Sequence, residues 1–245
     1  MRSLTANELI RCWEVGQSQH PLDRALTLLS FACPEQHRET LAAMSIGQRD
    51  AYLLTLREIT FGEQMNCWAD CPQCGERLEF SLKTSQMRLV ELQEPGMREY
   101  ILNTGEWELQ YRLPNSWDLA AIVGNRDYDQ AARQLRQRCL LEASQSGQQW
   151  QYDQLPEEII DTMVEAIAAT DPQIEILLDL DCPACSHHWQ VMLDIVWFIW
   201  KEISAKAQRI LEEVHILARF YGWREADILS MSTIRRQYYL SLVGY

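Results

Sequence analysis

The pattern of apolar side chains changes twice along the chain. In the first sixty residues the apolar positions recur at the spacing of a helix, and Leu9 and Trp13 fall on one face of the first such segment. Thr5 and Glu8 precede them with the spacing of a capping box, which is typical of a helix N-terminus. The pattern therefore predicts an N-terminal helical region over residues 1–60.

From residue 61 the apolar positions alternate with polar ones. Residues 61–84 alternate around one pair of cysteines, and residues 174–193 alternate around a second pair. Residues 100–113 alternate around a turn at Asn103-Thr104-Gly105, which predicts a β-hairpin. Because strands flank both cysteine pairs, residues 61–193 are expected to form a split zinc ribbon with an inserted segment.

Helical spacing returns inside this inserted segment. It covers residues 128–144 and a second stretch after Pro156, so the insertion is expected to carry helices as well as the hairpin. Cys139 lies on the apolar side of the first of these helices. A cysteine in that position is most simply a small buried hydrophobic residue.

The C-terminal region is helical again. The longest helical stretch runs over residues 195–221 and is followed by Gly222, a residue that commonly ends helices. Two shorter helical segments follow over 226–229 and 234–243, which gives a C-terminal region of residues 194–245. The predicted fold class is α+β: mainly helical, with a split zinc-ribbon-like β element, a β-hairpin and a long C-terminal helix.

Two nearly identical Asp-Cys-Pro-x-Cys segments stand at the turns of the predicted ribbon. Two residues between cysteines let a tight turn aim both sulfurs at one ion, about 2.3 Å from each. Four thiolates from two such pairs complete a tetrahedral soft-metal site, and zinc is its usual occupant. The predicted ligands are Cys71, Cys74, Cys182 and Cys185.

Other roles for these cysteines fit the pattern less well. A thioredoxin-like redox pair has one motif that opens a helix, whereas both motifs here lie between predicted strands. An iron–sulfur cluster accepts the same ligand type but normally has other spacings. Cys67, His187 and His188 are close enough in sequence to act as alternative ligands, although a strand position away from the metal is the simpler interpretation for each.

The predicted metal site has the ligand set of a structural site. A catalytic zinc usually keeps one coordination position open for water, and four thiolates leave none. The chain also has no Gly-x-x-x-x-Gly-Lys loop, no His-Glu-x-x-His motif and no Gly-x-Ser-x-Gly elbow. We therefore expect a structural zinc and no enzymatic activity, with a hydrolase that has an open zinc site as a weaker alternative.

Charge adds information about partners. The 245-residue chain has a formal net charge of −13, which disfavours a protein that coats nucleic-acid phosphates. Residues 201–245 carry seven basic and five acidic side chains, a net of +2, so the first 200 residues carry −15. A zinc-ribbon regulator that binds nucleic acid through Arg235 and Arg236 is the main alternative, but the ribbon strands contain only Arg77 and Lys83 as basic residues.

The cysteine content and the N-terminal pattern indicate a compartment. Eight cysteines in a chain whose N-terminus has no apolar block are typical of a protein kept under reducing conditions, so we expect a cytoplasmic protein. The longest strongly apolar run, residues 195–200, is far too short to cross a bilayer. No membrane insertion is therefore expected.

The C-terminal motifs are the second informative feature. A long helix with Glu213-Val214-His215 is followed by Tyr221-Gly222-Trp223, an acidic turn and an Arg235-Arg236-x-x-Tyr239-Leu240 helix. This arrangement resembles baseplate proteins of contractile-tailed phages and of extracellular contractile injection systems. The same resemblance extends to the two cysteine motifs and to three further segments, residues 4–9, 20–25 and 112–119.

The resemblance implies a component or assembly chaperone of the baseplate hub, in contact with hub, spike or tube proteins of a contractile particle. Such a protein works in the cytoplasm during assembly and then either stays in the phage tail or injection particle or leaves it. Aromatic residues and arginines anchor many protein interfaces, although the aromatics here have an alternative role in packing the last helices together. The expected partner-binding residues are Tyr221, Trp223, Arg235, Arg236, Tyr238 and Tyr239.

Overall fold

The computed structural model describes residues 1–244, which form two compact units. The terminal unit consists of residues 1–34 together with the chain from Asp194 onward, and the central unit consists of Glu35–Leu193. The units cut across the three regions expected from the sequence. The first two helices belong with the C-terminal helices, whereas the next two belong with the ribbon and the sheet.

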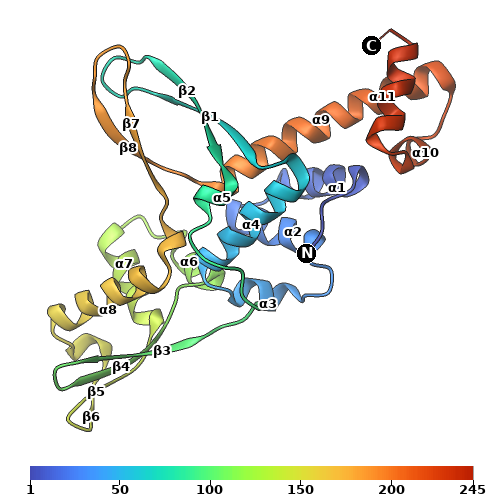
Figure 1. The fold of residues 1–245 in the computed structure, drawn as a ribbon. Helices are drawn as coiled ribbons and strands as arrows, with labels where there is room; N and C mark the ends of the chain where they lie inside the picture. Colours follow the sequence, from blue (N-terminus) through green and yellow to red (C-terminus); the bar gives the residue numbers. More distant parts are fainter. Residues whose placement is uncertain (245) are drawn as a thin grey trace. The chain divides into compact units, whose positions relative to one another are not determined.

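The terminal unit is entirely helical. Its helices are α1 (Ala6–Gly16), α2 (Pro21–Ala32), α9 (Ile195–Tyr221), α10 (Glu225–Ser230) and α11 (Thr233–Leu242), as Figure 1 shows. The expected capping box is present, since Thr5 accepts a hydrogen bond from the Glu8 amide and the Glu8 carboxylate accepts one from the Thr5 amide.

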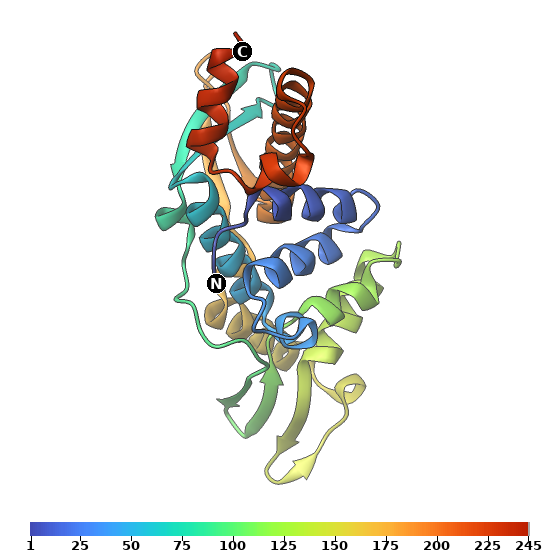
Figure 2. The same ribbon diagram turned by 90° about the vertical axis from the view of Figure 1, so that its right-hand side faces the viewer.

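Helix α9 is the centre of the terminal unit. Its buried face repeats with three- and four-residue spacing, and Ile203, Ala207, Ile210 and Leu217 are at most 1% exposed. All four other helices of the unit contact α9, and Figure 2 shows α11 beside its C-terminal part. α9 ends at Gly222, whose φ of +66° is left-handed backbone that favours glycine.

A glycine at the end of α1 lets a tryptophan approach closely. A Cβ atom on Gly16 would overlap the Trp200 ring of α9. Arg24 of α2 lies 4.5 Å from the centroid of that ring and donates from Nε to the Gly16 carbonyl at 2.8 Å. Three helices therefore meet at one buried indole.

The central unit holds all the strands. Its main helices are α3 (Arg38–Ala43), α4 (Ile46–Phe61), α5 (Thr84–Met87), α6 (Ser116–Ile122), α7 (Tyr128–Cys139) and α8 (Glu157–Thr170), with short 3-10 turns η1 (Tyr152–Gln154) and η2 (Pro172–Ile174). Its strands are β1 (Gln64–Asp70), β2 (Arg77–Lys83), β3 (Glu99–Thr104), β4 (Trp107–Arg112), β5 (Leu140–Gln145), β6 (Gln148–Gln149), β7 (Leu177–Asp181) and β8 (His188–Met192).

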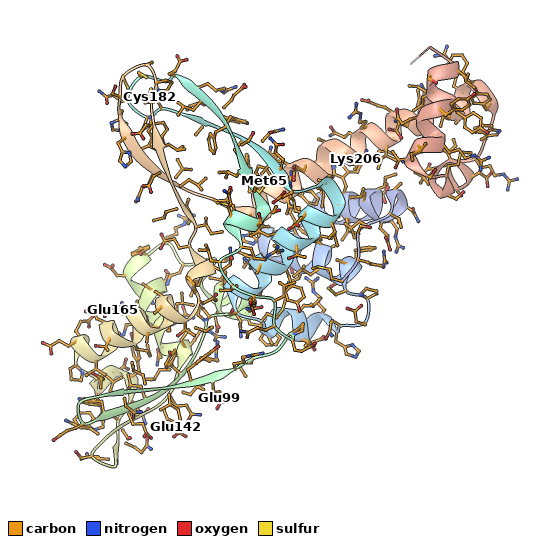
Figure 3. All side chains as sticks on the ribbon, viewed as in Figure 1. Met65, Glu99, Glu142, Glu165, Cys182 and Lys206 are labelled. Atoms are coloured by element: carbon orange, nitrogen blue, oxygen red, sulfur yellow. The ribbon has the colours of Figure 1, made fainter. Side chains whose placement is uncertain are left out.

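A four-stranded antiparallel sheet with the order β3-β4-β5-β6 carries the larger core. The expected hairpin is β3–β4, and Gly105 in its turn has a φ of +59°. One face of the sheet presents Leu109, Tyr111 and Ala143, which pack with Met163 of α8. Figure 3 labels Glu99 and Glu142 on strands β3 and β5 of this sheet.

The helix expected over residues 128–144 is shorter in the structure. α7 ends at Cys139, and the next six residues form β5, which pairs with β4. Backbone pairing with β4 and burial of Ala143 override the helical spacing here. Cys139 is 1% exposed, as expected for a small buried hydrophobic residue, and burial raises its pKa to about 12.

A buried carboxylate connects three elements of the central unit. Asp118 of α6 is fully buried, pairs with Arg112 of β4, and accepts a hydrogen bond from Arg138 Nε of α7 at 2.7 Å. It also accepts from the Asn115 amide at 3.0 Å, which completes a capping box at the start of α6. Burial alone would raise the pKa of Asp118, but these hydrogen bonds outweigh burial and lower it.

The predicted fold class is confirmed, because the chain is mainly helical, has small antiparallel sheets and carries a long C-terminal helix. Within residues 1–244, no helix is both long enough and apolar enough to span a lipid bilayer.

Candidate metal centre

Two hairpins of the central unit bring the two cysteine pairs together. β1 and β2 pair antiparallel from Gln64↔Lys83 to Asp70↔Arg77, and β7 and β8 pair from Leu177↔Met192 to Asp181↔His188. The hairpin tips lie side by side, and Figure 3 labels Cys182 there. The ligand atoms of the four predicted cysteines lie within 4.8 Å of one another: Cys71, Cys74, Cys182 and Cys185.

The spacing of the sulfur atoms fits a tetrahedral metal. The Sγ atoms of Cys71 and Cys185 are 3.7 Å apart, and those of Cys74 and Cys182 are 3.5 Å apart. Four ligands at about 2.3 Å from a central zinc are separated by roughly 3.8 Å in a regular tetrahedron. The four thiols therefore lie close to zinc-binding distances.

The two tips have the same backbone conformation. The Gly75 amide donates to the Cys71 carbonyl at 2.9 Å, and the Ser186 amide donates to the Cys182 carbonyl at 2.9 Å. The residue after the second cysteine is left-handed in both tips, with φ of +77° at Gly75 and +57° at Ser186. In each tip the first cysteine is the more buried one, so each hairpin presents one inner and one outer sulfur.

The cysteines differ in how easily they lose a proton. Burial disfavours the Cys71 thiolate, but hydrogen bonds from the Cys74 and Gln73 amides outweigh it and lower the pKa of Cys71 to about 7. A hydrogen bond from the His187 amide favours the Cys185 thiolate, yet burial and the other three cysteines raise its pKa to about 12. Four thiolates this close need a cation to offset their mutual repulsion.

The three alternative ligands are placed outside the cluster. His188 Nδ1 lies 3.0 Å from an Asp181 carboxylate oxygen, and the His187 ring stacks on Trp189 with centroids 5.9 Å apart. Cys67 lies within β1 opposite Phe80, and its Sγ lies 3.9 Å from a backbone carbonyl. None of the three belongs to the four-cysteine group.

The residues expected to bind partners divide into two sets. Tyr221, Trp223 and Tyr239 pack on one another: the first two rings stack with centroids 4.4 Å apart, and Tyr239 meets both edge-on. These three rings therefore have the alternative role, which is to pack the last helices together. Tyr238 is 63% exposed, and Arg235 is also exposed.

Arg236 was expected at the partner surface but lies inside the terminal unit. It is 1% exposed, and its Nε donates to Glu213 of α9 at 3.0 Å. Its guanidinium also donates to the Met231 carbonyl at 2.8 Å, and Gln237 donates to the second Glu213 oxygen. The buried carboxylate of Glu213 on α9 holds this arginine, and the Arg-Arg pair in the sequence does not reveal it.

Sequence reasoning missed two exposed residues on the same helix. Ile234 is 85% exposed and Leu242 is 60% exposed. They lie four residues before and four residues after Tyr238, so helical spacing on the outer side of α11 could have identified them.

Residues 9–200 of the chain match the protein family described as T4 bacteriophage base plate protein. The chain belongs to this family. The matched residues include both cysteine pairs, the four-stranded sheet and the start of α9. The resemblance to baseplate proteins is thereby confirmed at the level of the family.

The match to the base plate family does not reach the C-terminal motifs. Residues 201–245, which include Tyr221 and Arg235, lie outside it. No curated protein matched the chain, and no solved structure did. The family description therefore applies to the central unit and to the first part of the terminal unit.

Proposed function

We propose that this chain is a non-enzymatic structural component or assembly chaperone of the baseplate hub in a contractile phage tail or a related injection particle. The family match over residues 9–200 is the observation that supports this role. The chain would act in the cytoplasm during assembly, in contact with hub, spike or tube proteins. Its contact surface would lie at the end of the terminal unit, where Arg235 and Tyr238 are exposed.

We further propose that Cys71, Cys74, Cys182 and Cys185 bind one zinc ion with a structural role. The support is the clustering of four sulfurs within 4.8 Å, the two sulfur–sulfur distances of 3.7 and 3.5 Å and the matching backbone of the two tips. Four thiolates fill the coordination sphere and leave no position for a substrate or a reactive water. The metal would join two hairpins whose cysteine pairs are separated by 107 residues, 75–181.

The baseplate role can be tested by co-expression. The full chain would be produced with candidate hub, spike and tube proteins from the same genome, and each complex would be recovered by affinity purification. At least one of these proteins should be retained with the chain. If no hub, spike or tube protein is retained, the proposed role is wrong.

The nucleic-acid alternative predicts a different result. A regulator should shift DNA or RNA in a gel titration at low salt, and the shift should weaken steeply as salt rises. We expect no such shift, because the chain has a net charge of −13 and Arg236 is paired with Glu213.

A further inference from the structure

Helix α11 has two apolar faces, and the terminal unit uses one of them. On the inner face Leu240 is 1% exposed, and Tyr239 packs on the aromatic rings at the end of α9. On the outer face three apolar side chains stand four residues apart, at i, i+4 and i+8. We name them the outer stripe: Ile234, Tyr238 and Leu242, which are 85%, 63% and 60% exposed.

The outer stripe is held in place by the inner face. Arg236 on the inner face pairs with the buried carboxylate of Glu213 at 3.0 Å, and Gln237 donates to the same carboxylate at 2.8 Å. Ser232 caps the start of the helix by accepting a hydrogen bond from the Arg235 amide. A helix fixed on one side presents its other side with little further loss of conformational entropy on binding.

We propose that α11 inserts the outer stripe into an apolar groove of another baseplate component, with carboxylates at the rim of that groove facing Arg235. The inference rests on the proposed baseplate role and names the surface through which it acts. Residues at i, i+4 and i+8 lie on one helix face, and an amphipathic helix occupies a groove through apolar anchors spaced three or four residues apart on one face. An exposed tyrosine at the centre of the stripe is a residue type that often dominates binding energy.

Charge favours an acidic partner. Arg235 is the exposed charged residue of α11, and the helix contains no carboxylate. The positive end of the helix dipole lies beside Ile234, at the same end as Arg235. A groove with carboxylates near that end would complement both charges.

Size disfavours a dimer in which two copies of α11 pack on each other. A ten-residue helix is roughly 15 Å long, whereas a stable protein interface involves about 20–30 residues on each side. Two copies of the outer stripe packed on each other would be far smaller than that. A second α11 would also bring no carboxylate to meet Arg235, so a groove that wraps the helix satisfies both requirements better.

The test uses the full chain and the hub, spike or tube protein that it retains. Binding would be measured by titration for the wild type, Ile234→Asp and Tyr238→Ala. Two matched variants alter exposed apolar residues elsewhere in the terminal unit: Val15→Asp on α1 and Trp197→Ala at the start of α9, which are 48% and 51% exposed. Circular dichroism and thermal melting would establish that every variant is folded.

The two outer-stripe variants should raise the dissociation constant by about ten-fold or more, and the two matched variants should leave it within about two-fold. Arg235→Glu should also weaken binding, and its effect should shrink as salt is raised. Arg209→Glu, an exposed charge change on α9, should have a smaller effect.

Three outcomes would overturn the inference. If the outer-stripe variants bind like the wild type, α11 is not the docking surface, while the proposed baseplate role stands. If Ile234→Asp converts a dimer of this chain into a monomer in light scattering, the occupant is a second copy. If the wild type retains none of the hub, spike or tube proteins, both the inference and the proposed baseplate role fail.

Discussion

The two units of this protein are held together by different kinds of contact. In the central unit the strands of the ribbon bury little, since Met65 is the one residue of β1 and β2 that is fully buried, and the hairpin tips meet through four sulfurs. In the terminal unit a continuous apolar face of α9 is covered by other helices, and an ion pair of Glu213 with Arg236 lies inside. The ribbon therefore has little buried apolar surface of its own, whereas the helical unit has a continuous one.

This comparison teaches where the chain can be perturbed independently. Replacing the clustered cysteines or lowering the pH should destabilise the central unit. Disrupting the packing on α9 or the buried pair of Glu213 with Arg236 should destabilise the terminal unit. Hydrogen exchange measured by mass spectrometry distinguishes destabilisation of one unit from destabilisation of the other, because peptides from the ribbon and peptides from α9 report on different units.

Loss of a metal ligand should have the largest effect. Cys71→Ser or Cys182→Ser is expected to release zinc and to lower the free energy of unfolding of the central unit by about 4–5 kcal/mol, because a long loop is no longer closed. Metal analysis should find one zinc per wild-type chain and none in either variant. Exchange should rise in ribbon peptides and stay low in α9 peptides.

The matched control for this prediction is Cys139→Ser. Cys139 is buried in the same unit but lies outside the four-cysteine group, so its replacement should leave zinc content unchanged. Equal zinc content in the wild type and the Cys71→Ser variant would contradict the ligand assignment.

Removing the buried carboxylate of the terminal unit should come next. Glu213→Ala leaves Arg236 buried without its counter-charge, which is expected to cost about 3–5 kcal/mol. Exchange should rise in peptides from α11 while zinc content stays constant. Thermal melting and metal analysis together measure both effects.

Two further variants sharpen this prediction. Glu213→Leu combined with Arg236→Met replaces both charges and should recover much of the lost stability. Asp153→Ala breaks an exposed pair, since the side chain of Arg133 is 60% exposed and that of Asp153 is 62% exposed. Its loss should change the free energy of unfolding by less than about 1 kcal/mol. Equal costs for the buried and the exposed pair would contradict the role given to burial.

Acid should weaken the central unit through Asp118. Its pKa is lowered in the folded state, so its contribution is fully present above about pH 4, the ordinary range of an aspartate, and is lost as the pH falls through the folded value. Asp118→Asn should cost about 2–3 kcal/mol at neutral pH and should flatten the loss of stability in acid. Urea unfolding between pH 2 and 7 measures the cost at neutral pH and the loss of stability in acid. If the variant and the wild type lose stability equally as the pH falls, Asp118 does not have this role.

The smallest effects should come from the left-handed residues of the tips, and their signs should differ. Ser186→Gly relieves a φ of +57° and should stabilise the central unit by up to about 1 kcal/mol, whereas Gly75→Ala at +77° should destabilise it by about 1–2 kcal/mol. Melting of the zinc-loaded protein would show the two shifts. Shifts of the same sign would mean that the tips are not equivalent.

Much of the fold was predictable because its signals are local. The capping box at Thr5 and Glu8, the hairpin around Gly105 and the end of α9 at Gly222 depend on neighbours within a few residues. The clustering of the four cysteines was also predictable, since two matching motifs with strand flanks carry it. The metal itself stays a prediction.

The features that were not predictable depend on residues far apart in sequence. β5 is a strand because β4 offers it a partner, although its own spacing is helical. Arg236 is buried because it pairs with Glu213 on another helix. Nothing in the Arg-Arg sequence distinguishes Arg236 from Arg235. The grouping of α1 and α2 with α9 likewise requires contacts across more than 150 residues.

That grouping has a consequence for the order in which the protein can fold during synthesis. The central unit is one continuous segment, so all of it has been synthesised before α9 begins. α1 and α2 are made before the central unit, but they can pack on Trp200 only after the central unit has been made. Residues 1–34 therefore have no α9 to cover their apolar faces until the whole central unit has been synthesised.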